Sequence, residues 1–422
     1  MVQRGYVECP TCGKLYQLKI QVDQNIRLYD WPICFECIDC GDILNFTYSK
    51  KGFFPQQSNY KPAPDDEPVT TIGYSSSLPV TDDIYMKELN YAESIVKFSL
   101  FMNLQYGHFS PEELHEFDIF LIQMQNNLLP FKGVFQALFP ILKKGNVKAF
   151  SKKAALFFDI KDYKELNSAQ DMFDYYFELL EKTYINLCPQ AYSDNYHNKF
   201  IVPLGDWINK ASKAEVKGLK DKLDESGKIS LWYKEEALPY LARMINDVHK
   251  LIPSMIYSSV GESDLKRRGD LKTVTLSCKE ATDYYKDGYE VFAKGLKILV
   301  GLNNIVENGS IDSFVNPQLQ SLAGITAFAQ LKSGLMVNQL SDYTTISNYL
   351  DDAMNNRVRN AASHDGIEYD ASNQQVHCHY DATDKTKVFE TNLISISRMC
   401  YLQLLHIIEE TLLARKIVEK AK

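Results

Sequence analysis

The sequence predicts a mainly α-helical protein that carries a small β module at its N-terminus. Two Cys-x-x-Cys-Gly turns lie before residue 42. Between them, Tyr16–Val22 alternates apolar and polar side chains with the period of two that is typical of a strand. From about residue 83 onward the apolar positions recur mostly with a helical period, and they continue into a C-terminal helical bundle.

Composition divides the chain further. Residues 51–82 are rich in Pro, Ser, Gln and Asp, and such a composition buries too little apolar surface to order itself, so we expect a linker there. Glycines and a Lys-Arg-Arg run within 259–276 indicate a loop between two helical regions. The predicted domains are a cysteine module at 1–50, a linker at 51–82, a helical middle region at 83–260 and a helical domain at 278–422. The main helices are expected over 112–128, 131–144, 168–187, 236–252, 278–306, 318–338, 344–363 and 387–419.

Length, hydropathy and charge limit the classes of function. A chain of 422 residues is too long for one simple core. No run approaches about eighteen apolar residues, and no apolar leader precedes the first cysteine, so we expect a cytoplasmic protein without a membrane span. The net charge of −8 argues against non-specific coating of nucleic acid, because such binding relies on neutralising phosphates. Any contact with RNA is therefore expected at a local site.

Five of the nine cysteines crowd into residues 9–40, which predicts a metal site rather than a disulfide scaffold. Cys9 and Cys12 form the first turn, and Cys37 and Cys40 form the second. Two residues between cysteines allow both thiolates to reach one ion, and four thiolates in a tetrahedron suit zinc. Cys34 has the same spacing to Cys37, so Cys34 and Cys37 are a rival second pair, although the glycine at 41 favours Cys37 with Cys40.

This arrangement resembles a zinc ribbon. A closed tetrathiolate site has no open position for chemistry, so we expect the zinc to be structural. Residues 1–50 carry five basic and six acidic side chains, and the thiolates add negative charge. A protein partner or an architectural role therefore suits this module better than a strong grip on nucleic acid.

The stretch from Asn356 to Gly366 carries the second candidate site. It follows a segment with a helical pattern, and Gly366 is suited to end the helix. Arg359, Asn360 and His364 are therefore expected in the last turns of a helix, with Asn360 and His364 on one face because they are four residues apart.

The sequence Arg359-Asn360-Ala361-Ala362-Ser363-His364 resembles the signature of the HEPN superfamily, which is Arg, a polar residue, three variable residues and His. The order of elements over roughly 278–420 is also similar to that family. The resemblance implies metal-independent cleavage of RNA at a site shared by two chains. It also implies that such proteins often act as toxins or as bacterial, including anti-phage, defence effectors.

The residue types suit this chemistry. RNA carries its own nucleophile, the 2′-hydroxyl, and cleavage needs proton transfer and stabilisation of a charged phosphorane. Histidine is the side chain that most often transfers protons in enzymes, so His364 suits this role. Arg359 suits a two-pronged contact with phosphate, and Asn360 is expected to orient His364 or the phosphate. A two-fold dimer would bring two copies of each residue together.

Other interpretations stay open. Arg359 can cap nearby carbonyl groups and His364 can stabilise a helix end, which would leave a non-catalytic scaffold or sensor for protein or nucleic-acid partners. His377 and His379 point the same way along an expected strand, either as exposed residues, as a metal pair or as an RNA contact. The leading hypothesis is a homodimeric endoribonuclease that acts on RNA, with the middle region and the ribbon available to a protein trigger or inhibitor.

Overall fold

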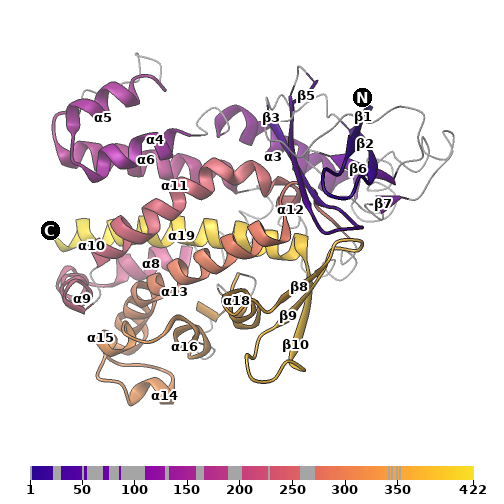
Figure 1. Cartoon of the computed structure of the whole chain (residues 1–422). Coiled ribbons are helices and arrows are strands. Elements are labelled where there is room, and N and C mark those ends of the chain that lie inside the picture. The colour runs from indigo at the N-terminus through magenta and orange to yellow at the C-terminus, as the bar shows by residue number, and fades with distance from the viewer. Residues whose placement is uncertain are drawn as a thin grey trace.

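The computed structural model describes residues 2–21, 30–49, 52–54, 70–75, 85–86, 110–128, 133–157, 166–188, 202–226, 229–256, 271–340, 343, 346–347, 350 and 353–422. Helices predominate in these residues and the strands form three small sheets, which confirms the predicted fold class. The N-terminal strands lie at one side of a helical body whose middle is crossed by the last helix, α19 (Leu393–Ala421) (Figure 1). None of the described helices is both long and apolar enough to span a membrane.

The N-terminal module consists of two sheets, each containing one cysteine turn. Strands β1 (Val2–Glu8) and β2 (Leu15–Gln21) are antiparallel and flank the first turn. Strands β3 (Asp30–Glu36) and β4 (Ile43–Ser49) are antiparallel and flank the second. The strand expected from the period-two pattern is therefore present as β2, and alternate side chains of the strands enter a common core. Its buried members include Val7, Tyr16, Leu18, Ile20, Ile33, Phe35, Leu44 and Phe46.

Two parts of the expected linker are strands of this module. β5 (Gly52–Phe54) pairs with β4, and β6 (Thr70–Ser75) pairs in parallel with β2. A further short strand, β7 (Tyr85–Met86), pairs with β6. The linker expectation is wrong for these residues, because Thr, Ile and Tyr in β6 favour a strand and Ile72 is buried beside Leu18 of β2.

The middle region is helical, as expected. Capping boxes fix the starts of two of its helices, at Ser110 with Glu113 and at Ser168 with Asp171. Its elements are α3 (Pro111–Asn127), α4 (Val134–Lys143), α5 (Val147–Ala154), α6 (Ala169–Leu187), α8 (Val202–Lys210), α9 (Lys213–Ser226), α10 (Ile229–Trp232), the π-helical turn η4 (Tyr233–Ala237), α11 (Leu238–Asp247), the 3₁₀ turn η5 (Val248–Lys250) and α12 (Ile252–Met255).

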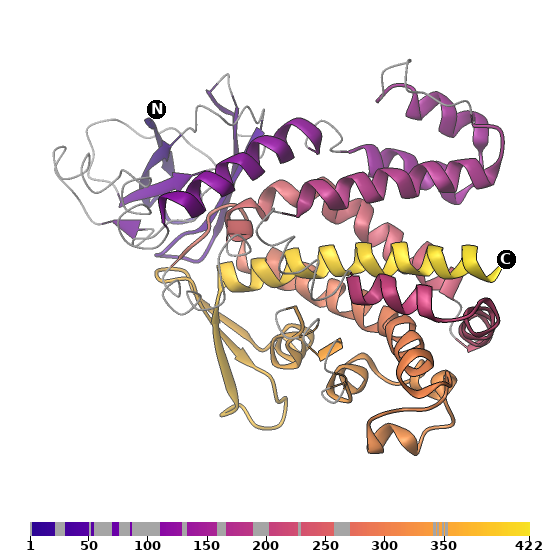
Figure 2. The ribbon, with the colours of Figure 1, turned by 180° about the vertical axis from the view of Figure 1, so that it is seen from behind.

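The C-terminal region contains two long helices with short elements between them. These elements are α13 (Cys278–Asn308), α14 (Pro317–Gln320), α15 (Ile325–Phe328), α16 (Ser333–Asn338), α18 (Asn356–Ser363), β8 (Ile367–Asp370), β9 (Gln375–His379), β10 (Val388–Asn392) and α19. The three strands form an antiparallel sheet in the order β10-β9-β8, which lies beside α18 (Figure 2).

The helix expected over 236–252 is divided among η4, α11, η5 and α12, and three helices expected in the C-terminal region also have different boundaries. The helix expected over 318–338 is divided into α14, α15 and α16, and Gly324 between two of them adopts a left-handed φ of 86°. The helix expected over 344–363 is interrupted before the motif, because Asn355 is extended and caps the start of α18. The last helix begins at Leu393 rather than 387, because the preceding residues belong to β10 and Asn392 caps α19.

The two long helices α13 and α19 pack side by side at the centre of the core (Figures 1 and 2). Gly288 and Gly295 on α13 permit this close approach. A Cβ atom at Gly295 would lie 2.0 Å from Oε2 of Glu410 on α19, and one at Gly288 would lie 2.3 Å from Oε1 of Gln403. Helix α19 also packs against α6, α9 and α12, so the middle and C-terminal regions share one hydrophobic core.

One extended segment joins the N-terminal module to the C-terminal sheet. The backbone N–H of Cys34 in β3 donates to the carbonyl of Val274, 2.8 Å away. The neighbouring residue, Thr273, exchanges two hydrogen bonds with the buried side chain of Gln374, which precedes β9. Residues 271–276, expected as part of a loop, are therefore held between the module and the sheet that follows α18.

Candidate functional site

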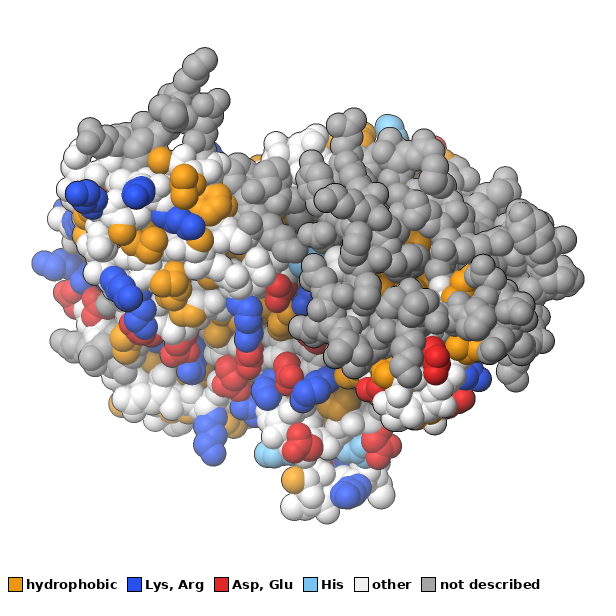
Figure 3. All heavy atoms as spheres, turned by 45° about the horizontal axis from the view of Figure 1, so that its top comes forward, with side chains coloured by type: hydrophobic (Ala, Val, Ile, Leu, Met, Phe, Trp, Pro, Cys, Tyr) orange, Lys and Arg blue, Asp and Glu red, His pale blue; other side chains and the backbone are white. Residues whose placement is uncertain are grey.

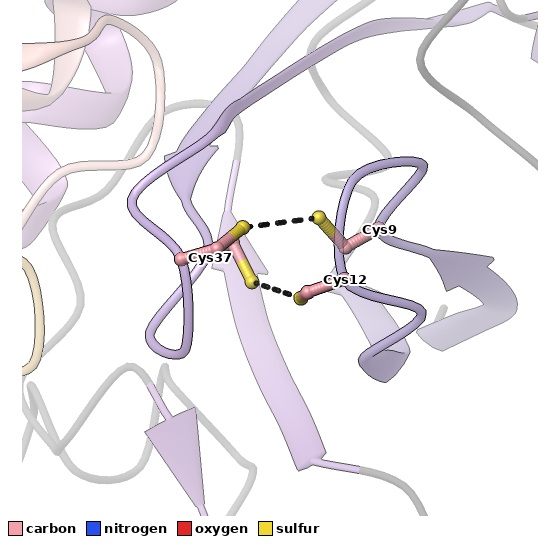
Figure 4. Close-up of side chains that lie close together, drawn as sticks. Cys9, Cys12 and Cys37 are labelled. Carbon is pink, nitrogen blue, oxygen red and sulfur yellow. Dashed lines mark hydrogen bonds between the residues drawn. The ribbon is translucent and has the colours of Figure 1, made fainter.

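The first candidate site is formed by the two cysteine turns, which place Cys9, Cys12, Cys37 and Cys40 together. Figure 4 shows Cys9 and Cys12 of the first turn facing Cys37 of the second. All four sulfur atoms lie within 4.8 Å of one another. The Sγ atoms of Cys9 and Cys40 are 3.6 Å apart, and those of Cys12 and Cys37 are 3.5 Å apart. A tetrahedral ion with metal–sulfur bonds of about 2.3 Å separates its sulfurs by about 3.8 Å. The four predicted ligands therefore fit one metal ion.

The two turns have the same backbone hydrogen bonds. In the first turn, Cys9 donates to the carbonyl of Lys14 and Gly13 donates to that of Cys9. In the second, Cys37 donates to Asp42 and Gly41 donates to Cys37. Both glycines have a left-handed φ, 78° at Gly13 and 73° at Gly41, which explains why glycine follows each Cys-x-x-Cys.

The surroundings of Cys37 favour a thiolate. Burial raises the pKa of its thiol, but the hydroxyl of Tyr16 donates to Sγ at 3.0 Å, and the backbone N–H groups of Asp39 and Cys40 also lower it. Together they bring the pKa of Cys37 to about 7. The thiolate is the form that binds metals. The hydrogen bond from Tyr16 therefore favours metal binding by Cys37. Tyr16 was not among the residues that the cysteine spacing indicates.

The rival ligand Cys34 lies elsewhere. It is buried within β3 and is not part of the group of four sulfurs. Burial and the nearby carboxylates of Glu280 and Glu36 raise the pKa of its thiol far above the usual range, which disfavours the thiolate. The geometry therefore supports Cys37 with Cys40 as the second pair.

This geometry predicts different outcomes for two single substitutions. Cys40→Ser removes one of four ligands and is expected to lower the metal content from about one ion per chain to a small fraction, because metal binding and folding of the module are coupled. Cys34→Ser is the matched control and is expected to retain the metal. Elemental analysis of both purified proteins measures this. Loss of metal in Cys34→Ser alone would contradict the assignment.

The second candidate site lies at the end of α18. Its first turn is capped by the Asn355 side chain, and its last turn is closed by a hydrogen bond from Gly366 N–H to the Ala361 carbonyl, 2.8 Å. Gly366 was expected to end the helix, and the left-handed conformation at this helix end is adopted by the preceding residue, Asp365, with a φ of 53°. Gly366 instead permits close packing on β9, because a Cβ there would lie 2.3 Å from the carbonyl oxygen of His379.

Arg359 is half-buried and held by neighbours on two elements. Its Nε and Nη2 donate to Oε1 of Glu290 on α13, and its Nη1 donates to Oδ1 of Asn360 at 3.1 Å. The ring of Tyr289 lies under the guanidinium, 5.9 Å from it. Glu290 is itself fixed, because Ser333 on α16 donates to its other oxygen at 2.6 Å. The guanidinium is therefore held in one orientation.

His364 follows the last residue of α18 and is exposed. No hydrogen bond or ion pair reaches its ring from the described residues, whereas its backbone N–H donates to the carbonyl of Asn360 at 3.1 Å. Arg359 and His364 are five residues apart, which corresponds to about 140° around a helix. Within one chain the two side chains therefore leave α18 in different directions, and the Asn360 amide orients Arg359 rather than His364.

Three residues of this site lay outside the sequence motif. Glu290 and Ser333 come from helices distant in sequence, and no spacing signal marked them. Arg357 on the exposed face of α18 lies against the rings of Tyr380 and Phe389, at 5.5 and 5.7 Å, and so anchors the C-terminal sheet to α18.

The two histidines of β9 do not form a metal site with other described residues. His377 faces Glu390 at 3.6 Å and His379 faces Glu368 at 3.3 Å, so each has its own carboxylate partner across the sheet. Within the described part of the chain, only the four cysteines form a group of three or more ligands.

Comparison of the chain with protein-family models, with curated proteins and with solved structures finds no match.

Proposed function

We propose that the protein is a metal-independent endoribonuclease whose active site contains Arg359, Asn360 and His364. The observation that carries the proposal is the arrangement at the end of α18. A fixed, half-buried guanidinium lies five residues before an exposed imidazole that has no partner in the described residues. RNA cleavage requires a preorganised cation that stabilises the charged phosphorane and an accessible side chain that transfers protons. The guanidinium suits the first role and the imidazole suits the second.

The proposed reaction is an internal transesterification. A base removes the proton of the 2′-hydroxyl, the 2′-oxygen bonds to phosphorus, and the bond to the 5′-oxygen breaks as that oxygen receives a proton. His364 transfers protons, because an imidazole exchanges its proton near neutral pH. The products are a 2′,3′-cyclic phosphate and a 5′-hydroxyl, and no metal is needed to generate the nucleophile.

Arg359 retains donors for the phosphate despite its ion pair. A guanidinium has five N–H groups. Two of them point at Glu290 and one at Asn360, which leaves two for the charged oxygens of the phosphorane. The Glu290 carboxylate therefore orients the Arg359 guanidinium and leaves two of its N–H groups to contact the phosphate.

A homodimer completes the proposed site. Since Arg359 and His364 of one chain leave α18 in different directions, one chain alone supplies a poor match to both sides of a phosphate. A two-fold axis near the exposed end of α18 would place His364 of one protomer opposite Arg359 of its partner.

The metal of the cysteine site is proposed to be zinc with a structural role. Four thiolates at tetrahedral spacing suit zinc, and a site closed by four protein ligands leaves no position for water or substrate. The N-terminal module and the middle region would then receive a protein trigger or inhibitor in a toxin or defence effector.

The proposed chemistry predicts that cleavage of RNA survives moderate concentrations of EDTA. It also predicts that the fragments end in 2′,3′-cyclic phosphate, because the 2′-hydroxyl is the nucleophile. Mass spectrometry of the fragments measures both properties in one experiment. Fragments with 3′-hydroxyl ends, or activity that appears only with Mg²⁺, would indicate a different active site.

A second candidate function is a non-catalytic scaffold or sensor. The ion pair between Arg359 and Glu290 favours it, because this pair also ties α18 to the central helix α13. Under this alternative, purified protein binds partners without cutting RNA, and the same nuclease assay separates the two functions.

A further inference from the structure

The hairpin of helices α4 and α5 has a charge opposite to that of the rest of the chain. Residues 133–157 contain five lysines and no Asp or Glu. Since the whole chain carries −8, the remaining residues carry −13. Blue side chains gather on the side of the molecule where α4 and α5 lie (Figure 3). The lysines of this segment are Lys143, Lys144, Lys148, Lys152 and Lys153.

Two of the five lysines are accounted for by local partners. Lys143 forms an ion pair with Glu235, and Lys153 lies over the ring of Phe157, 5.6 Å from its centre. Lys144, Lys148 and Lys152 are exposed, and no ion pair reaches them from the described residues. We call these three residues the lysine patch.

Helix stability explains the lysine patch only in part, because the helix dipoles favour Lys152 in the last turn of α5 and Lys144 at the C-terminal end of α4. Lys148 lies in the first turn of α5, where the helix dipole disfavours a positive charge. Lys148 and Lys152 are four residues apart, and like charges at this spacing destabilise a helix. Three exposed cations that lack an ion-pair partner in the described part of an otherwise acidic chain are expected to bind an external polyanion.

We propose that the lysine patch is a sequence-independent docking surface for the phosphate backbone of RNA. The inference rests on the proposed function, because it assigns the patch to the same substrate. The α4–α5 hairpin lies well away from α18 in both ribbon views, on the other side of the central helices α13 and α19 (Figures 1 and 2). The patch therefore anchors RNA that extends well beyond the cleaved bond, and it contributes nothing to a short oligonucleotide.

Direct binding measurements test the patch without relying on cleavage. The full-length protein with His364→Ala keeps RNA intact, and the patch is removed in it by Lys144→Gln, Lys148→Gln and Lys152→Gln. The control carries Lys210→Gln, Lys213→Gln and Lys217→Gln, which are also exposed and without an ion pair in the described residues, but lie next to acidic neighbours such as Glu215. Fluorescence anisotropy of a labelled single-stranded RNA of about 40 nucleotides gives the affinity at several salt concentrations.

The patch variant is expected to bind this RNA about tenfold to fiftyfold more weakly at 0.15 M salt, and its log-log salt slope is expected to be smaller by about two. The control should change neither quantity by a comparable amount. In the background with His364 intact, the patch variant should cleave an RNA of about eight nucleotides as fast as the unsubstituted protein. If binding and salt slope are unchanged in the patch variant, the inference is wrong even where RNA cleavage is found. The inference is also wrong if the patch variant keeps its affinity for RNA but no longer binds vesicles of anionic phospholipid. That result would assign the patch to a membrane surface.

Discussion

Replacing His364 with alanine is expected to slow RNA cleavage by about a hundredfold to ten-thousandfold, because the proton of the 2′-hydroxyl then has no positioned acceptor. The loss should appear in kcat rather than in RNA affinity, since the imidazole acts in the transition state. The side chain is exposed, so the thermal unfolding temperature should hardly change. Cleavage assays at saturating RNA, together with thermal unfolding, measure the two properties.

His377→Ala provides the matched control for this substitution. His377 is also partly exposed and lies in the same region, on β9, but it faces Glu390 and is not part of the motif. Its replacement should leave the cleavage rate within a few-fold of the original. Equal loss of activity in both variants would mean that the C-terminal sheet, rather than the imidazole of His364, is what cleavage requires.

Arg359→Ala is expected to reduce the cleavage rate by about a hundredfold to a thousandfold, because the phosphorane loses a positioned cation. Arg359→Lys should restore little of it, since an ammonium group cannot reproduce the planar fork that Glu290 and Asn360 orient. Unlike His364, Arg359 is half-buried in an ion pair, so its loss should also lower stability somewhat. Measured rates and unfolding temperatures of both variants test these expectations.

Glu290→Gln tests whether Glu290 acts by orienting Arg359 or only by stabilising the folded protein. The amide keeps the shape of the side chain but weakens the hold on Arg359. The cleavage rate should fall less than in Arg359→Ala, and the change should not follow the change in unfolding temperature. If Arg359→Lys and Glu290→Gln are both fully active, the arginine serves only to tie α18 to α13, which is the scaffold alternative.

Local sequence patterns predicted much of the fold. The cysteine turns and the glycines at 13 and 41 define the metal centre, because ligand spacing is a property of a few consecutive residues. The capping box at Ser110 fixes the start of α3 for the same reason. The strand β6 was hidden by its Pro- and Ser-rich surroundings, and it is stabilised by pairing with β2, which is distant in sequence.

The candidate active site was visible only in part. The residues of the motif are consecutive on α18, so a sequence pattern finds them. Glu290 approaches Arg359 only because α13 packs beside α18, and Ser333 joins them through a third helix. The division of the helix expected over 344–363 depends on Asn355, whose backbone N–H donates to the hydroxyl of Tyr285 on α13, a contact made in the folded state.

The central claim, that two chains share one site built from Arg359 and His364, is tested most directly by mixing two inactive variants. Arg359→Ala and His364→Ala chains are combined under conditions that exchange subunits, and cleavage of RNA is measured in EDTA beside each variant alone. The shared site predicts that the mixture regains a substantial part of the original activity, because mixed dimers pair an intact Arg359 with an intact His364 from the other protomer. A mixture that exchanges subunits yet stays as inactive as its components, while the unsubstituted protein cuts RNA, would contradict the shared site.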